Sequence, residues 1–238
     1  MAYTTEQLLE RWENVHEIEN LMGRRAFFLL WIKDQKVFEE MWSKNEPTLG
    51  FNSGYYVGYD SVAAYFGALR ELYLKRASLA KKAHGDELGD KADEDLIGVG
   101  AVHPNNLTTP LIELAEDMQT AKGMWYYMDA SVDYGASGRE SSMHWGRLAV
   151  DFIKEDGGWK IWHMIYADDI DCEMGGNWTK PAVAKEKDPV FGALAEISFP
   201  EPDKPGQHEV WNDKRQLREF PKMPVPYKTF AETFSYGV

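Results

Sequence analysis

Several ionisable side chains of the sequence fall on faces of the chain that are otherwise apolar. Asp129 and Tyr127 share one strand face of "GMWYYMDA" with Trp125, and His163 stands in the middle of the strand-like segment "GGWKIWHMIYADD". Arg25 falls on the apolar stripe of the N-terminal helix. Histidine and aspartate are common general acids and bases, and an apolar pocket raises the pKa of a carboxylate. A buried arginine requires a partner or a ligand oxyanion. These residues are therefore candidates for proton transfer and oxyanion stabilisation.

Each candidate also has a purely structural interpretation. His163 and His144 are compatible with hydrogen-bonded core histidines, and Tyr127 with a core tyrosine whose hydroxyl is satisfied. Asp129 is compatible with a strand end that faces solvent, and Arg25 with an ion pair to a glutamate of its own helix or to a sheet carboxylate. The carboxylates of "ADDIDCE" are expected to be solvated charge at a strand end rather than a cation site.

A first β-hairpin is predicted in "TTPLIELAEDMQTAKGMWYYMDA", with its turn near "EDMQ". Pairing Ala115 with Thr120 places Glu113 opposite Lys122, and this opposite-charge pair suits a solvent face. The other face then carries Ile112, Leu114, Ala121, Gly123, Trp125, Tyr127 and Asp129. This register directs Asp129 inward, toward the predicted core.

A second hairpin is predicted in "SSMHWGRLAVDFIKEDGGWKIWHMIYADD", where "EDGG" is a strong turn signal. Pairing Lys154 with Trp159 places His163 on the apolar face, and His144 lies on that face near its far end. The apolar residues of this face are Leu148, Val150, Phe152, Ile161 and Ile165. We therefore expect His163 to lie on the face of the sheet that the helices cover.

Helices precede the hairpins in the chain. Thr4 and Gln7 form a capping-box pattern at the start of a long helix that runs to about Ile32, and "VFEEMW" predicts a shorter second helix. "TLGFNSGYYVG" is predicted as a strand, and "YDSVAAYFGALRELYLKR" as a third helix with Asp60 or Ser61 as N-cap. The polar segment "KKAHGDELGDKADEDL" is predicted as an exposed loop.

Composition restricts the classes of partner. The 238 residues carry a net charge of −13, which disfavours binding to nucleic acid and to anionic membrane surfaces. The N-terminus lacks the pattern of a signal peptide, and the longest apolar run, "AFFLLWI", is too short to span a membrane. Cys172 is the single cysteine, so an internal disulfide is excluded. We expect a cytoplasmic protein.

The C-terminal part of the chain differs from the rest in its amino-acid composition and in its lack of periodic apolar residues. Eight of the eleven prolines lie from Pro181 onward, and periodic apolar runs are few there. The aromatic segment "PVPYKTFAETFSY" is unlike a free linker. The sequence therefore predicts one domain over residues 1–177 and an extension over residues 178–238 that packs on its own domain or on a neighbouring subunit.

The order of these elements resembles the SnoaL-like branch of the nuclear transport factor 2-like superfamily. The resemblance rests on "EIENLMGRRAFFLLWIKDQKVFEEMW", "YYVGYDSVAAYF", "TTPLIELAEDMQTAKGMWY" and "GRLAVDFIKEDGGWKIWHM", and it covers roughly residues 8–175. It implies a cone-shaped α+β fold, with a curved antiparallel sheet packed on about three helices. The superfamily includes polyketide cyclases, scytalone dehydratase, bile acid 7α-dehydratase, ketosteroid isomerase and lignin-dimer lyases, besides non-catalytic binders, so the fold does not fix the function.

The resemblance also implies site residues. His103 in "GAVHPNNL" lies where dehydratases of the family carry a catalytic histidine, although a loop histidine that caps a turn is an alternative. Asp129 lies near the position of their second acid–base residue. The family often has a tyrosine near Arg25 and an aspartate a turn later, whereas this sequence offers Arg25, Leu29 and Trp31. The expected substrate-binding residues are Tyr55, Tyr56, Trp125, His144 and Phe28.

The sequence and the resemblance together predict a lyase that needs no cofactor and no metal. It would eliminate water or formaldehyde from a hydroxylated aromatic or polycyclic molecule, with isomerisation as a less favoured reaction. His103 and Asp129 would transfer protons, while Arg25, His163 or Tyr127 would orient oxygen. A homodimer or homotrimer is expected. Two alternatives stay open: a small-molecule-binding module of the same fold without catalysis, and an assembly protein that resembles a dioxygenase small subunit.

Overall fold

The computed structural model describes residues 3–180 and 185–238. The α-helices are α1 (Thr5–Leu30), α2 (Asp34–Met41), α3 (Tyr59–Ala83) and α4 (Gly85–Leu88). The strands are β1 (Thr48–Phe51), β2 (Gly54–Val57), β3 (Asn105–Leu114), β4 (Thr120–Gly135), β5 (Gly138–Glu155), β6 (Gly158–Cys172) and β7 (Lys204–Pro205). Short 3₁₀ helices are η1 (Asp93–Leu96), η2 (Phe191–Glu196) and η3 (Phe230–Glu232).

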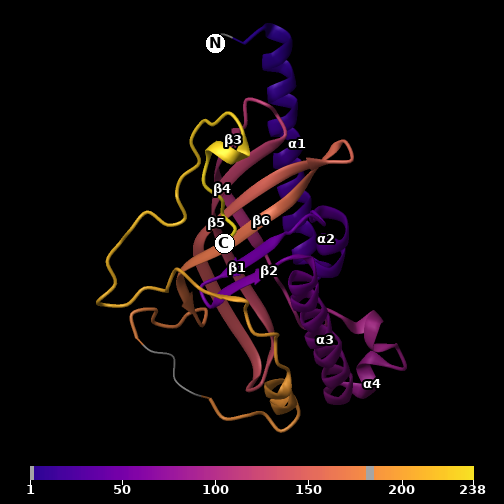
Figure 1. Ribbon diagram of the computed structural model, residues 1–238. Helices are drawn as coiled ribbons and strands as arrows, with labels where there is room; N and C mark the ends of the chain where they lie inside the picture. The colour runs from indigo at the N-terminus through magenta and orange to yellow at the C-terminus, as the bar shows by residue number, and fades with distance from the viewer. Residues whose placement is uncertain (1–2, 181–184) are drawn as a thin grey trace.

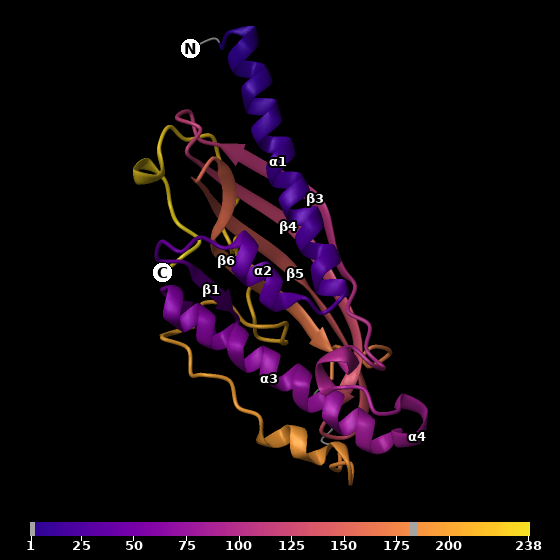
Figure 2. The ribbon, with the colours of Figure 1, turned by 90° about the vertical axis from the view of Figure 1, so that its right-hand side faces the viewer.

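The strands form one curved sheet in the order β3-β4-β5-β6-β1-β2-β7. Neighbouring strands are antiparallel, except that β1 runs parallel to β6. Helices α1, α2 and α3 lie across one face of the sheet (Figure 2), and the C-terminal segment, drawn in yellow, runs along the opposite side (Figure 1). The predicted α+β class, with a curved sheet packed on helices, is confirmed.

Helix α1 packs on the sheet through only part of its length. The predicted capping box at its start is present, because Thr4 and Gln7 exchange side-chain and backbone hydrogen bonds. Ile18 and Met22 are buried in the core, whereas Leu8 and Trp12 are exposed. Figure 1 shows the reason: the N-terminal turns extend past the end of the sheet. The apolar stripe of α1 is therefore a core face only from its middle onward.

The segments around α2 and α3 differ from the sequence predictions. Residues 48–58 form the hairpin of β1 and β2 rather than one strand, because the chain reverses at Asn52 and pairs with itself. Helix α2 begins at Asp34, ahead of the predicted start. Helix α3 has Gly58 as N-cap instead of Asp60 or Ser61, and it extends to Ala83 into the segment predicted as a loop. The rest of that segment contains α4 and η1.

Both hairpin registers were predicted correctly near their turns. Glu113 pairs with Lys122 and Lys154 pairs with Trp159. The face of the first pair was predicted wrongly, since Lys122 is buried under the C-terminal segment and bonded to Asp151. Further from the turn of the second hairpin, register shifts interrupt the pairing of β5 with β6. Each shift changes which side chains of β6 face the helices.

The C-terminal segment covers the second face of the sheet. Tyr236 belongs to an apolar cluster with Met124, Ala149 and Ile165, and Tyr227 is buried beside Thr120. The extension therefore packs on its own domain, one of the two predicted placements. Residues 181–184 of the predicted extension lie outside the described residues. None of the helices in residues 3–180 and 185–238 combines the length and apolar content that a membrane crossing requires.

Candidate active site

A cavity of about 310 Å³ lies between the helices and the sheet. This volume is at the lower end of the range for small-molecule sites, roughly 300–1,000 Å³. The helical wall comes from α1, α2 and α3, and the sheet wall from β1, β3, β4, β5 and β6. Its lining is aromatic with interspersed ionisable groups: Arg25, Leu29, Asp34, Val37, Trp42, Leu49, Phe51, Tyr65, Phe66, Leu69, Tyr73, His103, Asn105, Tyr127, Asp129, Ser131, His144, Met164, Tyr166 and Asp168.

Half of the residues expected from the sequence converge on this cavity. Arg25 enters from α1 and His103 from the segment before β3. Tyr127 and Asp129 enter from β4, and His144 enters from β5. Asp129 is directly opposite His144 in the pairing of β4 with β5, within a continuous strand. The structure thus brings together five of the predicted side chains, whose catalytic roles stay predictions.

His163 does not join them, and its predicted face was wrong. Phe152 of β5 pairs with Ile161 of β6, and the preceding residue, Asp151, pairs with His163. Trp162 is therefore an extra, unpaired residue in β6. This bulge turns His163 to the other side of the sheet. There its Nδ1 lies 3.1 Å from Thr48 Oγ1, and its ring is near Phe230 of the C-terminal segment. His163 is therefore a core residue beneath the extension.

The burial of His163 makes a prediction about acid stability. Burial, with the nearby positive charge of Lys122, lowers the pKa of His163 from 6.5 to about 4. The unfolded chain binds the proton between these values, so stability is present above pH 6.5 and is lost as the pH falls toward 4. The linked loss from pH 7 to pH 4.5 is roughly 2–3 kcal/mol. Urea unfolding at both pH values should show this loss in the wild type but not in His163→Gln; equal losses would contradict it.

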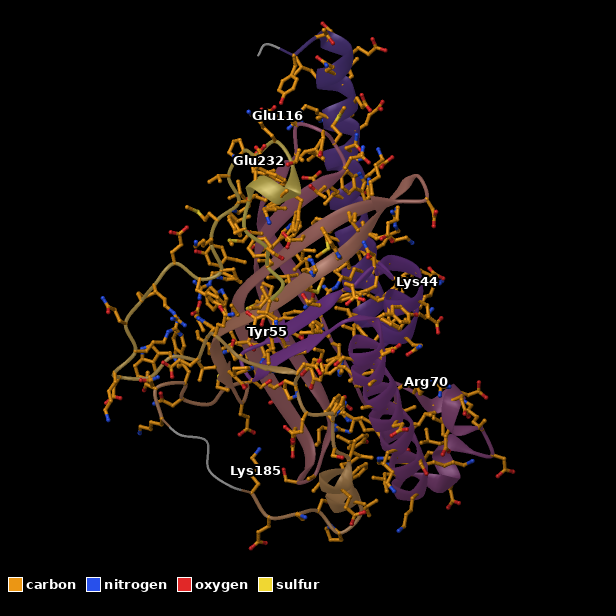
Figure 3. The ribbon with its side chains drawn as sticks, viewed as in Figure 1. Lys44, Tyr55, Arg70, Glu116, Lys185 and Glu232 are labelled. Carbon is orange, nitrogen blue, oxygen red and sulfur yellow. The ribbon has the colours of Figure 1, made fainter. Side chains whose placement is uncertain are left out.

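Four expected substrate-binding residues lie outside the cavity lining. Tyr55 of β2 is buried on the face covered by the C-terminal segment (Figure 3). Tyr56 packs in the core beneath the helices and donates its hydroxyl to the carbonyl of Pro200. Trp125 is a core residue, and Phe28 packs against the same core. The structure places these aromatic rings in packing positions.

His103 is oriented by a charged partner. Its Nε2 lies 3.0 Å from Oδ2 of Asp133, which also accepts a hydrogen bond from Arg76. A carboxylate at Nε2 selects the neutral tautomer with the proton on that nitrogen, which leaves Nδ1 as the basic atom. No partner for Nδ1 occurs among residues 3–180 and 185–238. His103 therefore has the arrangement of a positioned general base.

Two carboxyl groups of the cavity are held in a desolvated setting. Burial raises the pKa of Asp34, while nearby His103 and Arg25 act in the opposite direction. Burial likewise raises the pKa of Asp129, opposed by His144, His103 and Arg25. Asp34 Oδ2 and Asp129 Oδ1 are buried without a hydrogen-bond partner in the described chain. Buried polar atoms normally have partners, so both oxygens are suited to a ligand donor.

Arg25 is 3% exposed and forms no ion pair with any described residue. Its guanidinium donates to Tyr166 and, at 3.3 Å, to Oδ1 of Asn105. Its Nε is buried with no partner in the described chain. Burial lowers the pKa of Arg25 to about 10, against the opposing charges of Asp34 and Asp129. The group stays a cation at neutral pH and has a free donor for a ligand oxygen.

Sequence reasoning missed Asp34 and Asp168. Asp34 was assigned to a break between helices, although it begins α2 and points its carboxyl into the cavity. The available signal was an acidic residue just ahead of "VFEEMW", because acidic residues are common in the first turn of a helix. Asp168 belongs to the run of carboxylates in "ADDIDCE" that was expected to be solvated, yet it lines the cavity.

In the described part of the chain, no group of three or more His, Cys, Asp or Glu side chains is placed to hold a metal ion.

Comparison with known families agrees with the fold. A family model described as the SnoaL-like domain matches residues 11–165. The chain belongs to the SnoaL-like family. Because this match covers the three main helices and most of the sheet, the SnoaL-like domain contains nearly all of the cavity, and the C-terminal extension lies beyond it. No curated protein matched the sequence.

Solved structures with similar folds are distant from this SnoaL-like chain. Rv3472 of Mycobacterium tuberculosis, of unknown function, is 18% identical with a TM-score of 0.44, over 80% of this chain and 89% of its own. The Kfla4162 protein of Kribbella flavida is 12% identical with a TM-score of 0.49, over 68% and 94%. A hexachlorocyclohexane dehydrochlorinase of Novosphingobium barchaimii is 12% identical with a TM-score of 0.47, over 73% and 99%.

Proposed function

We propose that the protein is a cofactor-independent lyase that eliminates water or formaldehyde from a hydroxylated aromatic or polycyclic molecule. The observation that carries this proposal is the convergence of His103, Arg25 and buried carboxyl groups on one aromatic-lined cavity. Unpartnered buried atoms of Arg25, Asp34 and Asp129 face a space of small-molecule size. Membership of the SnoaL-like family agrees with a small-molecule site.

In the proposed reaction, His103 accepts the proton. In dehydration, Nδ1 takes the proton from a C–H group, whose electrons form the new double bond as the C–O bond breaks. In formaldehyde loss, Nδ1 takes the proton from the hydroxyl of a hydroxymethyl group, the C–C bond breaks with its electron pair on the remaining carbon, and a proton from Asp129 is transferred to that carbon. Asp133 stabilises the imidazolium that results, because its carboxylate is bound at Nε2. Asp129 shares the cavity, and its raised pKa suits a second proton carrier. General acid–base catalysis of this kind contributes about 10²–10⁴-fold.

Arg25 and Tyr127 stabilise the oxygen on which negative charge develops. Arg25 is fixed by Tyr166 and Asn105, so its free Nε–H is preorganised rather than mobile. A donor held in a buried site is worth more than one in water, because no solvent must reorganise during the reaction. The aromatic walls, among them Phe51 and Tyr166, which stack at 5.5 Å, would contact the flat rings of the substrate.

A panel of hydroxylated aromatic, steroid and polyketide compounds tests the proposal. Chelator-treated protein should change the ultraviolet absorbance of at least one compound as new conjugation forms. Arg25→Met should abolish this turnover because it removes the proposed oxyanion donor, and thermal unfolding should show that the variant is folded. The matched control is Arg24→Met, since Arg24 is the exposed neighbour on α1.

The outcomes separate the proposed lyase from a binding module. Turnover by the wild type and by Arg24→Met, but not by Arg25→Met, supports the lyase and its oxyanion donor. Tight binding of a panel compound without turnover would favour a non-catalytic binding protein. Turnover by Arg25→Met at the wild-type rate would remove Arg25 from the proposed mechanism.

A further inference from the structure

Two neighbouring carboxylates of β6, Asp168 and Asp169, lie on opposite faces of the sheet beside a second bulge. Trp145 pairs with Ile170, and the next residue, Gly146, pairs with Asp168, so Asp169 is the extra residue of β6. A bulge reorients the side chains beside it. Asp168 lines the cavity beneath the helices, while Asp169 points toward the C-terminal segment.

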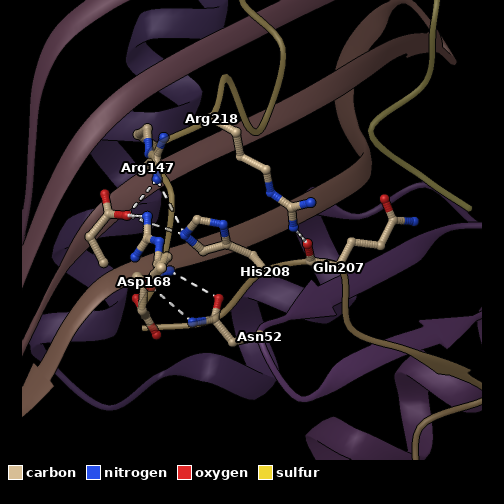
Figure 4. A network of polar contacts seen from close by, with 8 residues as sticks. Asn52, Arg147, Asp168, Gln207, His208 and Arg218 are labelled. Carbon is tan, nitrogen blue, oxygen red and sulfur yellow. Dashed lines mark hydrogen bonds and ion pairs between the residues drawn. The ribbon is translucent and has the colours of Figure 1, made fainter. Parts of the chain in front are cut away.

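Asp169 contacts cation-forming side chains on the other side of the sheet, where Arg147 and His208 lie close together (Figure 4). Its Oδ1 accepts from Arg147 at 2.6 Å and from Arg215, and it lies 3.2 Å from Nε2 of His208. These partners lower the pKa of Asp169 to about 2, against the effect of partial burial. Asp169 therefore acts as a structural anion that joins the sheet to the extension.

Asp168 is held in place through its backbone. Asn52 accepts from the backbone N–H of Asp168 at 3.1 Å and donates to its carbonyl at 2.9 Å (Figure 4). On the other side, a Cβ at Gly146 would lie 2.2 Å from the carbonyl oxygen of Ala167, so only glycine permits this approach of β5 to β6. The side chain of Asp168 thus projects into the cavity from a fixed position.

The carboxyl of Asp168 accepts no hydrogen bond from any residue of the described chain. Its side chain is 17% exposed, and its Oδ1 is buried with no hydrogen-bond partner in the described chain. His144 on β5 is the nearest cation-forming group, with Nδ1 3.8 Å from Oδ2. Burial, together with the charges of Asp171 and Asp169 on its own strand, raises the pKa of Asp168 to about 7. Arg25 and Asp129 line the same cavity from α1 and β4.

We propose that Asp168 is a catalytic proton donor, which protonates the departing oxygen of the substrate at the β6 end of the cavity. This inference rests on the proposed lyase function and adds the acid that an elimination needs. His103 removes a proton from carbon, the electrons of that C–H bond form the new double bond, and the C–O bond breaks with its electron pair on oxygen. Asp168 transfers its proton to that oxygen, so water departs and a carboxylate remains.

The catalytic cycle closes without any further reactant. After elimination His103 holds one additional proton and Asp168 lacks one, and exchange with solvent restores both. In this proposal His144 relays the proton, because its side chain is 33% exposed and its Nδ1 lies 3.8 Å from Oδ2 of Asp168. The departing group is a neutral hydroxyl, because a carboxylate or phosphate at this position would face Asp168 and Asp129 together.

The test combines a rate measurement with a direct titration. Asp168→Asn keeps the shape of the side chain but cannot donate a carboxyl proton, whereas Asp171→Asn changes an exposed neighbour that also lies 3.7 Å from His144. We expect Asp168→Asn to lower kcat about 100-fold or more, and Asp171→Asn to leave it within about threefold. Carboxyl carbon NMR of aspartate-labelled protein should show a group that titrates near pH 7 in the wild type, titrates at a lower pH in Asp171→Asn because one neighbouring negative charge is gone, and is absent in Asp168→Asn.

The two readouts distinguish failure of the inference from failure of the proposed function. If the wild type turns over a compound and Asp168→Asn does so at a similar rate, Asp168 is not the proton donor. If no compound is turned over, the lyase proposal fails, and the titration then decides about Asp168. A signal near pH 7 that Asp168→Asn removes supports a cavity-facing proton donor, and a carboxyl that titrates near pH 4 overturns it.

Discussion

Lys122→Met is expected to lower the free energy of unfolding by about 3–5 kcal/mol, which is the usual cost of removing one partner from a buried ion pair. Lys122 and Asp151 are both 0% exposed, and Lys122 Nζ lies 2.6 Å from Asp151 Oδ1. Without the ammonium group, Asp151 would be a buried charge with no cation. Thermal unfolding should show a melting temperature lower by roughly 6–20 °C for a chain of this size.

The pair is more than a local contact, because it joins the sheet to the C-terminal extension. The second oxygen of Asp151 accepts from the backbone N–H of Tyr236 at 2.7 Å and from the hydroxyl of Ser235 at 3.1 Å. Aromatic rings of the extension surround the ammonium at 4.4–5.9 Å, namely those of Tyr227, Phe230, Phe234 and Tyr236. Loss of Lys122 should therefore also increase amide hydrogen exchange near Tyr236.

Two variants make this prediction specific. Lys44→Met changes an exposed lysine (Figure 3) and should leave stability within about 0.5 kcal/mol. The double variant Lys122→Met with Asp151→Leu removes both charges and should recover much of the loss, since apolar replacements of buried pairs are often neutral. A Lys122→Met protein as stable as the wild type, with unchanged hydrogen exchange, would show that the pair does not anchor the extension.

Features set by local chemistry could be predicted from the sequence. The capping box of Thr4 and Gln7 and the turns of both hairpins depend on residues a few positions apart, and the structure contains all of them. The alternation of side chains in β4 placed Tyr127 and Asp129 toward the helices, as the structure shows. Register near a turn is fixed by the turn itself, so these assignments needed no knowledge of the tertiary fold.

Features set by tertiary contacts could not be predicted in this way. The bulge at Trp162 adds one residue to β6 and reverses the faces beyond it, so His163 was assigned to the wrong face. Asp168 was expected to be solvated, whereas it lines the cavity. Lys122 resembled a solvent-facing residue because its strand alternates correctly, and only the returning C-terminal segment buries it. Asp34 reaches the cavity because α2 begins earlier than its apolar residues indicated.

His103→Gln is expected to lower kcat by about 10²–10⁴-fold on any compound that the wild type converts, because it removes the general base. Glutamine retains a group that can hydrogen-bond to Asp133 but has no basic nitrogen at neutral pH. KM should change much less than kcat, since the aromatic walls and Arg25 stay in place. Steady-state kinetics, with urea unfolding as a check of the fold, measure this effect.

Two further variants separate the loss of the base from a general disturbance. His16→Gln changes an exposed histidine on α1 and should leave kcat unaltered. Asp133→Asn keeps an acceptor at Nε2 but removes the charge that stabilises the imidazolium, so its effect should be smaller than that of His103→Gln. A folded His103→Gln protein with wild-type kcat would instead transfer the base role to Asp34 or Asp129, whose pKa values burial already raises. His103 is favoured over those two carboxylates as the base, because the ion pair of Asp133 with Arg76 stands behind it and orients its ring.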